Sequence, residues 1–231
     1  GLYYELSEIM ERENKDMIVN MLYVRSSLER ANESRREMEA VNVKLLKQSE
    51  TDQMTGLANR YRLNAYSEKV LDYCYEHRLP LAMEILDIDF FKQYNDNYGH
   101  QQGDECIIAI ANELKKMEDG QTFCARYGGD EFIIIYAGIS AEEVHAKAGA
   151  LRQNIMNLKL EHLYSKALTI VTISQGISYG VPEEGNRSWD FLHTADMLLY
   201  QVKKRSRNDI CIADIRGQEL DLSSKQEKVE P

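Results

Sequence analysis

Cysteine is sparse in this sequence, and the few thiols have no spacing that would give them a shared task. The four cysteines are Cys74, Cys106, Cys124 and Cys211, far apart and without a CxxC pair. This excludes a zinc ribbon and a scaffold built on disulfides, and it indicates buried free thiols in a reducing compartment. We therefore expect a cytoplasmic protein.

Long apolar runs and a leader pattern are also missing. No run approaches the length that spans a bilayer, and the N-terminus has no signal-peptide pattern. The chain begins with Gly1 rather than Met. We expect it to be the cytoplasmic part of a longer, membrane-anchored or sensor-linked protein, with the sensor upstream and no membrane segment in this chain.

Positive charge is in deficit. The chain has 28 lysines and arginines against 38 aspartates and glutamates, which gives a formal net charge of -10. A protein that follows a nucleic-acid polymer needs clustered positive charge to neutralise phosphates. The composition therefore excludes a polymer partner, and any nucleotide chemistry is expected to use a small nucleotide and a metal ion.

The fraction of hydrophobic residues is sufficient for a buried core. The chain has 231 residues, 43% of them hydrophobic, which allows one domain with an extension or two small domains. The patterns predict helices at about 59–77, 103–117, 141–158 and 189–205, and strands at 79–91, on both sides of 128–129, at 168–178 and at 209–215. The strand that follows Pro80 is apolar on both faces apart from Glu84, which is typical of a central strand covered by helices. The expected fold is α+β, of an α/β-like kind, with mixed strand directions.

The first 49 residues have a heptad pattern, with no proline and no glycine after Gly1. One stripe is apolar throughout: Tyr3, Met10, Met17, Val24, Ala31, Met38 and Leu45. The companion positions are mostly polar, and Asn14 and Asn42 among them can fix the register at some cost in stability. The pattern favours a coiled coil that joins two copies of the chain, and the alternative is one amphipathic helix that packs on its own domain.

The stretch "RYGGDEF" places two glycines directly before two carboxylates. Gly128 and Gly129 allow a tight turn or a close approach to a ligand, and the isoleucines that follow predict a buried strand. Asp130 and Glu131 therefore lie at the mouth of a hairpin. Such a position can hold a metal, and it is also an ordinary place for a turn.

A second pair of acids ends the central strand. Asp87 and Asp89 are two residues apart, so that both are expected on one face. With Asp130 and Glu131 they could form an oxygen-rich site of the kind that suits Mg²⁺ or Mn²⁺. The alternative is that acids at a strand end simply face water.

The residues after this strand could bind a nucleotide. Lys92 could meet a phosphate as a point charge. Asn95 and Asp104 are expected on either side of a turn that contains Gly99 and Gly103, where a carboxylate that accepts from two adjacent donors would suit guanine. The alternative is that these side chains only shape the turn and cap the next helix.

Two cations near the end of the last predicted helix share one face. Lys203 and Arg207 are four residues apart. They could complement the negative end of the helix dipole, or grip a triphosphate, and both roles are compatible.

Four ordered motifs give the chain a resemblance to the GGDEF family of diguanylate cyclases. The motifs are "DQMTGLANR", "DIDFFKQYNDNYGHQQGD", "RYGGDEF" and "ADMLLYQVKKRSRN", and the resemblance spans about residues 51–215. It implies a palm-like fold similar to nucleotidyl cyclases, and the conversion of two GTP into cyclic di-GMP and two pyrophosphates. It also implies a homodimer, in which each copy holds one GTP.

The resemblance implies site residues as well. The catalytic set would be Asp130, Glu131 and Lys92. Mg²⁺, or Mn²⁺, would be held by Asp87, the Ile88 carbonyl and Asp130. The substrate contacts would be Asn95 and Asp104 to guanine, Lys203 and Arg207 to the phosphates, and the backbone of Gly128 and Gly129.

Two departures from the family pattern matter. Where many members have an RxxD motif that binds product as an inhibitor, this chain has Asp119 and Thr122, which predicts that the inhibitory site is absent. Ser206 stands where the last motif usually has a glycine that permits a left-handed turn, so that the placement of Arg207 is open.

We therefore expect an N-terminal signalling helix at 1–50, a catalytic domain at 51–215 and a polar tail at 216–231. The expected function is a GTP-specific diguanylate cyclase, controlled through the helix by an upstream sensor. Two alternatives are a non-catalytic GTP-binding signalling module of the same fold and a dimerisation fragment whose acids are incidental.

Overall fold

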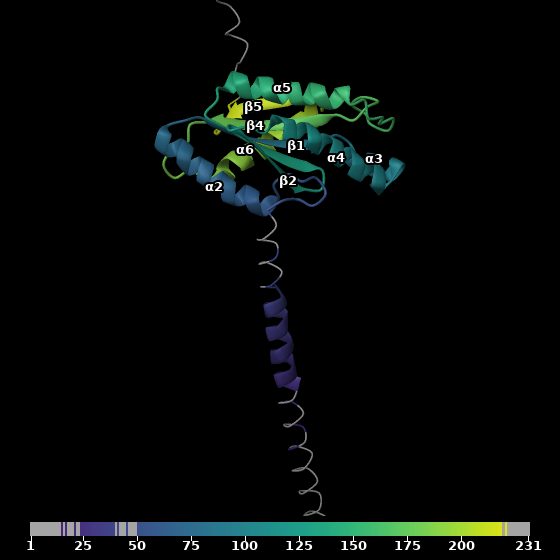
Figure 1. Cartoon of the computed structure of the whole chain (residues 1–231), viewed down its shortest axis with the longest axis vertical. Coiled ribbons are helices and arrows are strands. Elements are labelled where there is room, and N and C mark those ends of the chain that lie inside the picture. The colour runs from purple at the N-terminus through teal and green to yellow at the C-terminus, as the bar shows by residue number, and fades with distance from the viewer. Residues whose placement is uncertain are drawn as a thin grey trace, which may run out of the picture. The chain divides into compact units, whose positions relative to one another are not determined.

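The structure, a computed structural model, describes residues 15, 17, 21, 24–39, 41, 45, 50–218 and 220. The chain divides into two compact units, Gly1–Ser49 and Glu50–Pro231. In the first unit the described residues are helical, with a continuous helix at 24–39 (Figure 1). Tyr3 and Met10, and both asparagines of the predicted heptad pattern, lie outside the described residues. No helix among the described residues is long and apolar enough to cross a membrane.

The described part of the apolar stripe is open to solvent. Met17, Val24, Met38 and Leu45 are each more than half exposed. Exposed methionine, valine and leucine side chains in a row mark a surface that a partner can cover. The helix thus presents an apolar seam, as the heptad pattern predicts.

The second unit is built on a mixed five-stranded sheet of order β2-β3-β1-β4-β5. The strands are β1 (Leu81–Ile88), β2 (Thr122–Gly128), β3 (Glu131–Ala137), β4 (Ile173–Gly180) and β5 (Ile210–Asp214). The pairs β2–β3, β3–β1 and β1–β4 are antiparallel, and β5 is parallel to β4. The predicted α+β class with mixed strand directions is confirmed, and β1 is the central strand.

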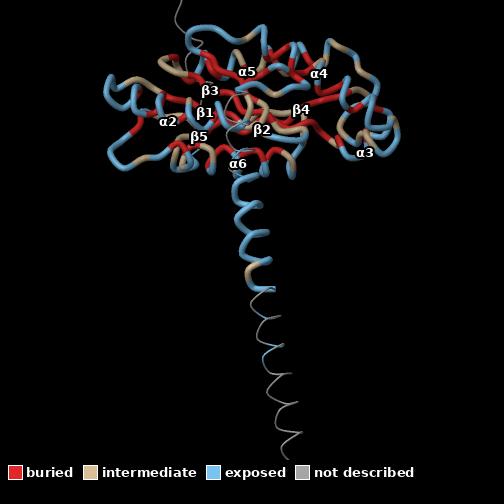
Figure 2. The backbone as a smooth tube through the Cα atoms, turned by 60° about the horizontal axis from the view of Figure 1, so that its bottom comes forward, coloured by how far each residue is buried: buried red, intermediate tan, exposed pale blue. Residues whose placement is uncertain are grey.

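Helices cover both faces of the sheet. They are α2 (Arg60–His77), α3 (Phe91–Tyr98), α4 (His100–Met117), α5 (Ala141–Asn157) and α6 (Ser188–Arg205). Helices α4 and α5 lie over one face, and α2 and α6 over the other (Figure 1). Strand β1 and its neighbours are accordingly buried between the two layers of helices (Figure 2).

Alternation along β1 explains why its sequence is apolar on both faces. Ala82 and Leu86 belong to the core under α4 and α5, whereas Leu81 and Met83 belong to the core under α2. Successive side chains of a strand point to opposite faces, so each layer receives its own set. The next residue on the second face after Met83 and Ile85 is Asp87, which places this carboxylate at the edge of the α2 and α6 side.

Two of the helices begin with side-chain caps. The Asn59 side chain accepts a hydrogen bond from the Arg62 backbone N–H at 3.0 Å and starts α2 where the sequence predicts it. Ser140 and Glu143 form a reciprocal capping box at the start of α5.

One predicted turn is wrong, and one predicted strand begins later than expected. The turn expected around Gly99 and Gly103 is the junction of α3 and α4: Gly99, with φ 85°, separates the helices, and Gly103 lies inside α4. Helix α3 is only eight residues long and buries only Phe91 and Tyr94 along its length, too short a pattern to predict a helix. The strand expected from residue 168 begins at Ile173, and before it only the isolated bridge of 161 with 170 is formed.

The middle of β1 holds a fully buried carboxylate. Glu84 accepts hydrogen bonds from the Tyr136 hydroxyl at 2.8 Å and from the Gln175 amide at 2.7 Å. Burial raises the pKa of Glu84 to about 7, although both hydrogen bonds favour the ionised form. The core therefore contains a group that titrates near neutral pH.

Replacing Glu84 with glutamine is expected to flatten the pH dependence of stability. Folded Glu84 has a pKa of about 7 against an ordinary value of 4.5, so it binds its proton more tightly in the folded state. Its contribution is therefore complete below pH 4.5 and is lost as the pH rises through 7, a change of about 3 kcal/mol in the free energy of unfolding. Urea unfolding of both proteins across this range measures the difference, and an equally steep profile in E84Q would contradict the assignment.

Candidate active site

The end of β1 lies beside the loop of the β2–β3 hairpin. Asp87 pairs in register with Glu131, the first residue of β3. Gly129 adopts a left-handed conformation, with φ 54°, and a Cβ placed on Gly128 or Gly129 would meet no atom within 4 Å. The fold thus brings Asp87, Asp130 and Glu131 together and leaves open space over the two glycines.

Asp87 is paired with a cation from α6. Its Oδ2 lies 2.7 Å from the Nζ of Lys203. Burial raises the pKa of Asp87 to about 6; the hydrogen bond from Lys203 lowers it, and the charges of Asp130 and Glu131 raise it. Lys203, which the sequence predicts to contact phosphates, therefore lies against Asp87, the first predicted metal ligand.

The two hairpin carboxylates are not paired with other side chains of the described structure. Within the described part of the chain, neither Asp130 nor Glu131 accepts a hydrogen bond through its side chain or forms an ion pair. Burial raises the pKa of Glu131; Lys203 lowers it, and the negative charges of Asp130 and Asp196 raise it. The loop therefore concentrates negative charge, and Lys203 is close enough to offset part of it at Glu131.

The carboxylates at this site suit a metal ion that also takes ligands from substrate phosphates and water. Among the described residues, no group of three or more His, Cys, Asp or Glu side chains is arranged to hold a metal by itself. Mg²⁺ in nucleotide sites usually takes one or two carboxylates together with substrate phosphates and water. Asp87 and Asp130 fit that second kind of site, and Ile88, the last residue of β1, follows directly.

An arginine that the sequence reading left without a role holds the hairpin loop in place. Arg126 donates to the Gly129 carbonyl through Nε at 3.1 Å and Nη2 at 2.9 Å, and its Nη1 lies 3.2 Å from Asp52. Although burial opposes it, hydrogen bonds from Thr55 and Arg126 lower the pKa of Asp52. Arg126 opens "RYGGDEF" and Asp52 lies in "DQMTGLANR", so both belong to recognisable motifs, but nothing in the local sequence links two residues 74 positions apart.

The expectation that both aspartates of "DID" contribute to an oxygen-rich metal site is wrong for Asp89. It is fully buried, and its carboxylate is occupied by protein donors. The donors are the Thr172 hydroxyl at 2.8 Å, the Ser174 hydroxyl at 2.7 Å, the Asn208 N–H at 2.9 Å and Arg207 Nη1 at 3.4 Å. With its lone pairs used in this way, Asp89 is a positioning residue rather than a metal ligand.

Arg207 is fixed by this carboxylate and by an aromatic ring. Its guanidinium lies 4.2 Å from the centre of the Phe90 ring, and it shares an ion pair with Asp89. Ser206 adopts φ -140°, so no glycine is needed there; the left-handed residues are Arg207 and Asn208 instead. Although Ser206 replaces the usual glycine of the motif, Arg207 still lies beside the end of β1.

Replacing Asp89 with asparagine is expected to lower stability by about 2 kcal/mol, because hydrogen bonds to a charged acceptor become hydrogen bonds to a neutral one and the new amide faces donors. The loss of the ion pair also frees Arg207, so activity should fall as well. Chemical unfolding measures the first effect. An unchanged midpoint would show that the carboxylate does not hold this end of α6.

The predicted guanine readers lie on α3 and α4. The Asn95 Oδ1 is buried with no hydrogen-bond partner in the described structure, and a Cβ at Gly103 would lie 1.8 Å from it. Gly103 is thus required for Asn95 to occupy this position, a role the sequence reading assigned only to a turn. Asp104 and Lys92 are exposed, and their side chains have no ion pair in the described structure.

A histidine far along the chain supports α3. The His162 Nε2 lies 3.1 Å from the carbonyl oxygen of Phe90, the residue before α3, and its ring meets Tyr94 edge-on with centroids 5.1 Å apart. No sequence signal connects positions 72 residues apart.

Solved structures with this fold define the class of domain. The chain matches the crystal structure of the coiled coil and GGDEF domain of DgcB from Caulobacter crescentus in complex with c-di-GMP, with 28% identity and a TM-score of 0.65, over 80% of this chain and 97% of that one. It also matches the active GGEEF domain of a diguanylate cyclase from Vibrio cholerae, with 30% identity and a TM-score of 0.58, over 68% and 97%. The fold is that of a GGDEF domain.

The sequence comparison agrees. Residues 49–209 match the family described as "Diguanylate cyclase, GGDEF domain", and the chain belongs to this family. The probable diguanylate cyclase DgcC of Escherichia coli (strain K12) is 34% identical over 161 residues, which are 69% of this chain and 42% of that protein. The chain spans less than half the length of the curated relatives it matches.

Proposed function

We propose that the protein is a diguanylate cyclase that condenses two GTP into cyclic di-GMP and releases two pyrophosphates. The observation that carries this proposal is the open pair Asp130 and Glu131 beside Asp87, at a hairpin whose glycines leave room for phosphates. Membership of the family supports it. In the domain division we propose, 1–50 is the signalling helix, 51–215 the catalytic domain and 216–231 a polar tail.

Guanine would be recognised at the junction of α3 and α4. The exposed Asp104 can accept from N1–H and from the exocyclic amine of guanine, whereas adenine presents an acceptor at N1. Asn95 supplies a second contact to the same edge, and its buried, unpaired oxygen supports a position reserved for a ligand. Lys92 lies on the same helix as Asn95, so its ammonium can meet the phosphates of the nucleotide bound there.

At the other end of the nucleotide, Lys203 and Arg207 would stabilise the phosphates. Asp87 and Asp89 hold these two cations near the end of β1, which would reduce the reorganisation needed when the nucleotide binds. Either Glu131, whose pKa is raised by burial, or Asp130 would accept the proton of the attacking 3′-hydroxyl.

Asp87, the Ile88 carbonyl and Asp130 would hold Mg²⁺ or Mn²⁺. The bound metal would supply charge neutralisation at the reacting phosphates and would lower the pKa of the attacking hydroxyl.

The reaction requires two copies of the chain, because each would hold one GTP. The exposed seam of Met17, Val24, Met38 and Leu45 supports a homodimer formed through the N-terminal helix. We propose an upstream sensor as the control on this helix, with catalysis on the cytoplasmic side.

Pyrophosphate release tests the proposed reaction. With Mg²⁺, GTP should yield one pyrophosphate per GTP consumed, and ATP should yield none. GTP binding without pyrophosphate would instead favour the non-catalytic signalling module, and equal turnover of ATP would overturn the role of Asp104.

The product is not expected to inhibit through an RxxD site. At the positions of that motif Asp119 forms an ion pair with Lys147 at 2.7 Å, and Lys147 also donates to the Thr122 hydroxyl at 3.0 Å. The hydrogen bond from Lys147 lowers the pKa of Asp119 to about 2, so a carboxylate stands where the inhibitory site needs a cation. Calorimetry with cyclic di-GMP should show no tight binding, and tight binding that D119A abolishes would contradict this prediction.

A further inference from the structure

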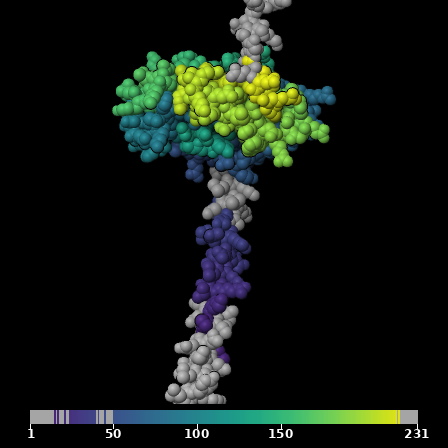
Figure 3. All heavy atoms as spheres, turned by 180° about the vertical axis from the view of Figure 1, so that it is seen from behind, coloured from purple at the N-terminus to yellow at the C-terminus, as the bar shows by residue number. Residues whose placement is uncertain are grey.

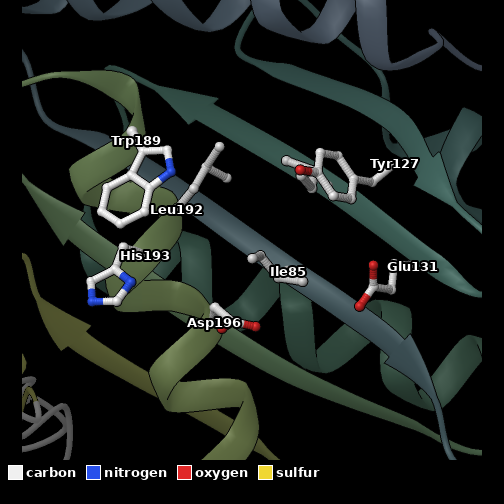
Figure 4. A pocket seen from close by; sticks show the side chains of 8 residues that line it. Ile85, Tyr127, Glu131, Trp189, Leu192, His193 and Asp196 are labelled. Carbon is white, nitrogen blue, oxygen red and sulfur yellow. The ribbon is translucent and has the colours of Figure 1, made fainter.

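A cavity of about 230 Å³ opens between α6 and the sheet, next to the proposed catalytic acids. Its floor comes from β1, β2 and β3 and its wall from α6 (Figure 4). The lining residues that the argument uses are Ile85, Tyr127, Glu131, Trp189, Leu192 and Asp196. The cavity is therefore apolar along most of its length and acidic at one end.

The acidic end has two carboxylates from different elements. Figure 4 shows Glu131 on the strand side and Asp196 on α6, both beside the space over Ile85. In the described part of the chain, neither side chain has a hydrogen bond or an ion pair. Lys203, a cation close enough to act on Glu131, is held by Asp87 at 2.7 Å. A ligand cation in the space between the two carboxylates would be attracted by both negative charges.

The apolar end offers a flat surface. Trp189 stacks on His193 with centroids 4.7 Å apart and an interplanar angle of 10°, and 63% of Trp189 is exposed. Tyr127 already carries a cation, since the Arg60 guanidinium lies 4.5 Å from its ring centre. The open surface of the tryptophan, with Leu192 beside it, can take one further ring.

We propose that this cavity binds a small organic cation with a single flat ring, its ammonium between Glu131 and Asp196 and its ring against Trp189 and Leu192. The volume restricts the ligand to about one ring with a short chain. The consequence for synthesis rests on the proposed function: a cation on Glu131 would weaken the attraction of the site for Mg²⁺. Such a ligand would raise the Mg²⁺ concentration needed for turnover without competing for the guanine site.

Trp189 is the only tryptophan in the chain, so its fluorescence reports directly on the cavity. The probe is phenethylamine, and phenethyl alcohol is the matched neutral molecule. We expect a saturable fluorescence change with the amine and a midpoint about tenfold higher with the alcohol. Asp196→Asn should raise the amine midpoint by a similar factor, whereas Asp72→Asn, at an exposed position of α2, should leave it unchanged.

Equal midpoints for the amine and the alcohol would overturn the proposal, as would a D196N variant that binds the amine like the unsubstituted protein. The fluorescence titration needs no turnover. A chain that makes no cyclic di-GMP but shows the expected midpoints would therefore refute only the proposed function, and an active chain without a saturable response would refute only the cavity site.

Discussion

Replacing Asp130 with asparagine is expected to reduce cyclic di-GMP synthesis about 10³-fold while the protein stays folded. The carboxylate is a proposed metal ligand at the reacting phosphates, and electrostatic stabilisation of this kind contributes several kcal/mol to the transition state. Because the Asp130 side chain makes no hydrogen bond or ion pair in the described structure, its charge contributes little to folding. Initial rates with GTP and Mg²⁺, beside thermal unfolding of the same samples, measure both effects.

The matched control is Asp72→Asn, which removes one charge from the exposed side of α2 and should keep full activity. Synthesis by D130N within tenfold of the unsubstituted protein would remove Asp130 from the metal site. A large loss of stability together with the loss of activity would show that the hairpin needs this charge for folding, which the structure does not predict.

Replacing Gly176 with alanine is expected to destabilise the protein by about 2 to 3 kcal/mol and to lower synthesis as well. A Cβ at this position of β4 would lie 2.2 Å from the Ala195 carbonyl oxygen and 2.3 Å from the Leu199 nitrogen. Both are backbone atoms of α6, so the whole helix would have to move, and with it Lys203. Urea unfolding and initial rates measure the two consequences.

Gly180 on the same strand provides the control. A Cβ there would meet only Ile215 at 3.9 Å, an ordinary contact, so G180A should change stability by less than about 0.5 kcal/mol. If G176A and G180A were equally stable, the close packing of α6 on β4 would not be what positions Lys203.

Local pattern was sufficient for the elements that carry the site. The start of α2, the apolar run of β1 and the glycine pair of the hairpin each have a signal within a few residues, and each lies where the sequence predicts it. The acids Asp130 and Glu131 could be assigned to the hairpin mouth for the same reason.

The different roles of Asp87 and Asp89 could not be predicted from the local sequence. The two differ because Thr172 and Ser174, 83 and 85 residues after Asp89, donate to Asp89, whereas Lys203 reaches Asp87. Spacing places both aspartates at one strand end, but only the paired strand β4 and the end of α6 determine which carboxylate stays available. The link of Arg126 to Asp52 was missed for the same reason.

The most direct test of the account is mass spectrometry of the product formed from GTP and Mg²⁺ over a range of protein concentrations. We predict cyclic di-GMP from GTP and none of the adenine analogue from ATP, at a rate that rises faster than linearly with protein, because two copies must meet to join two nucleotides. Bound GTP with no cyclic product at any concentration would contradict the proposed cyclase.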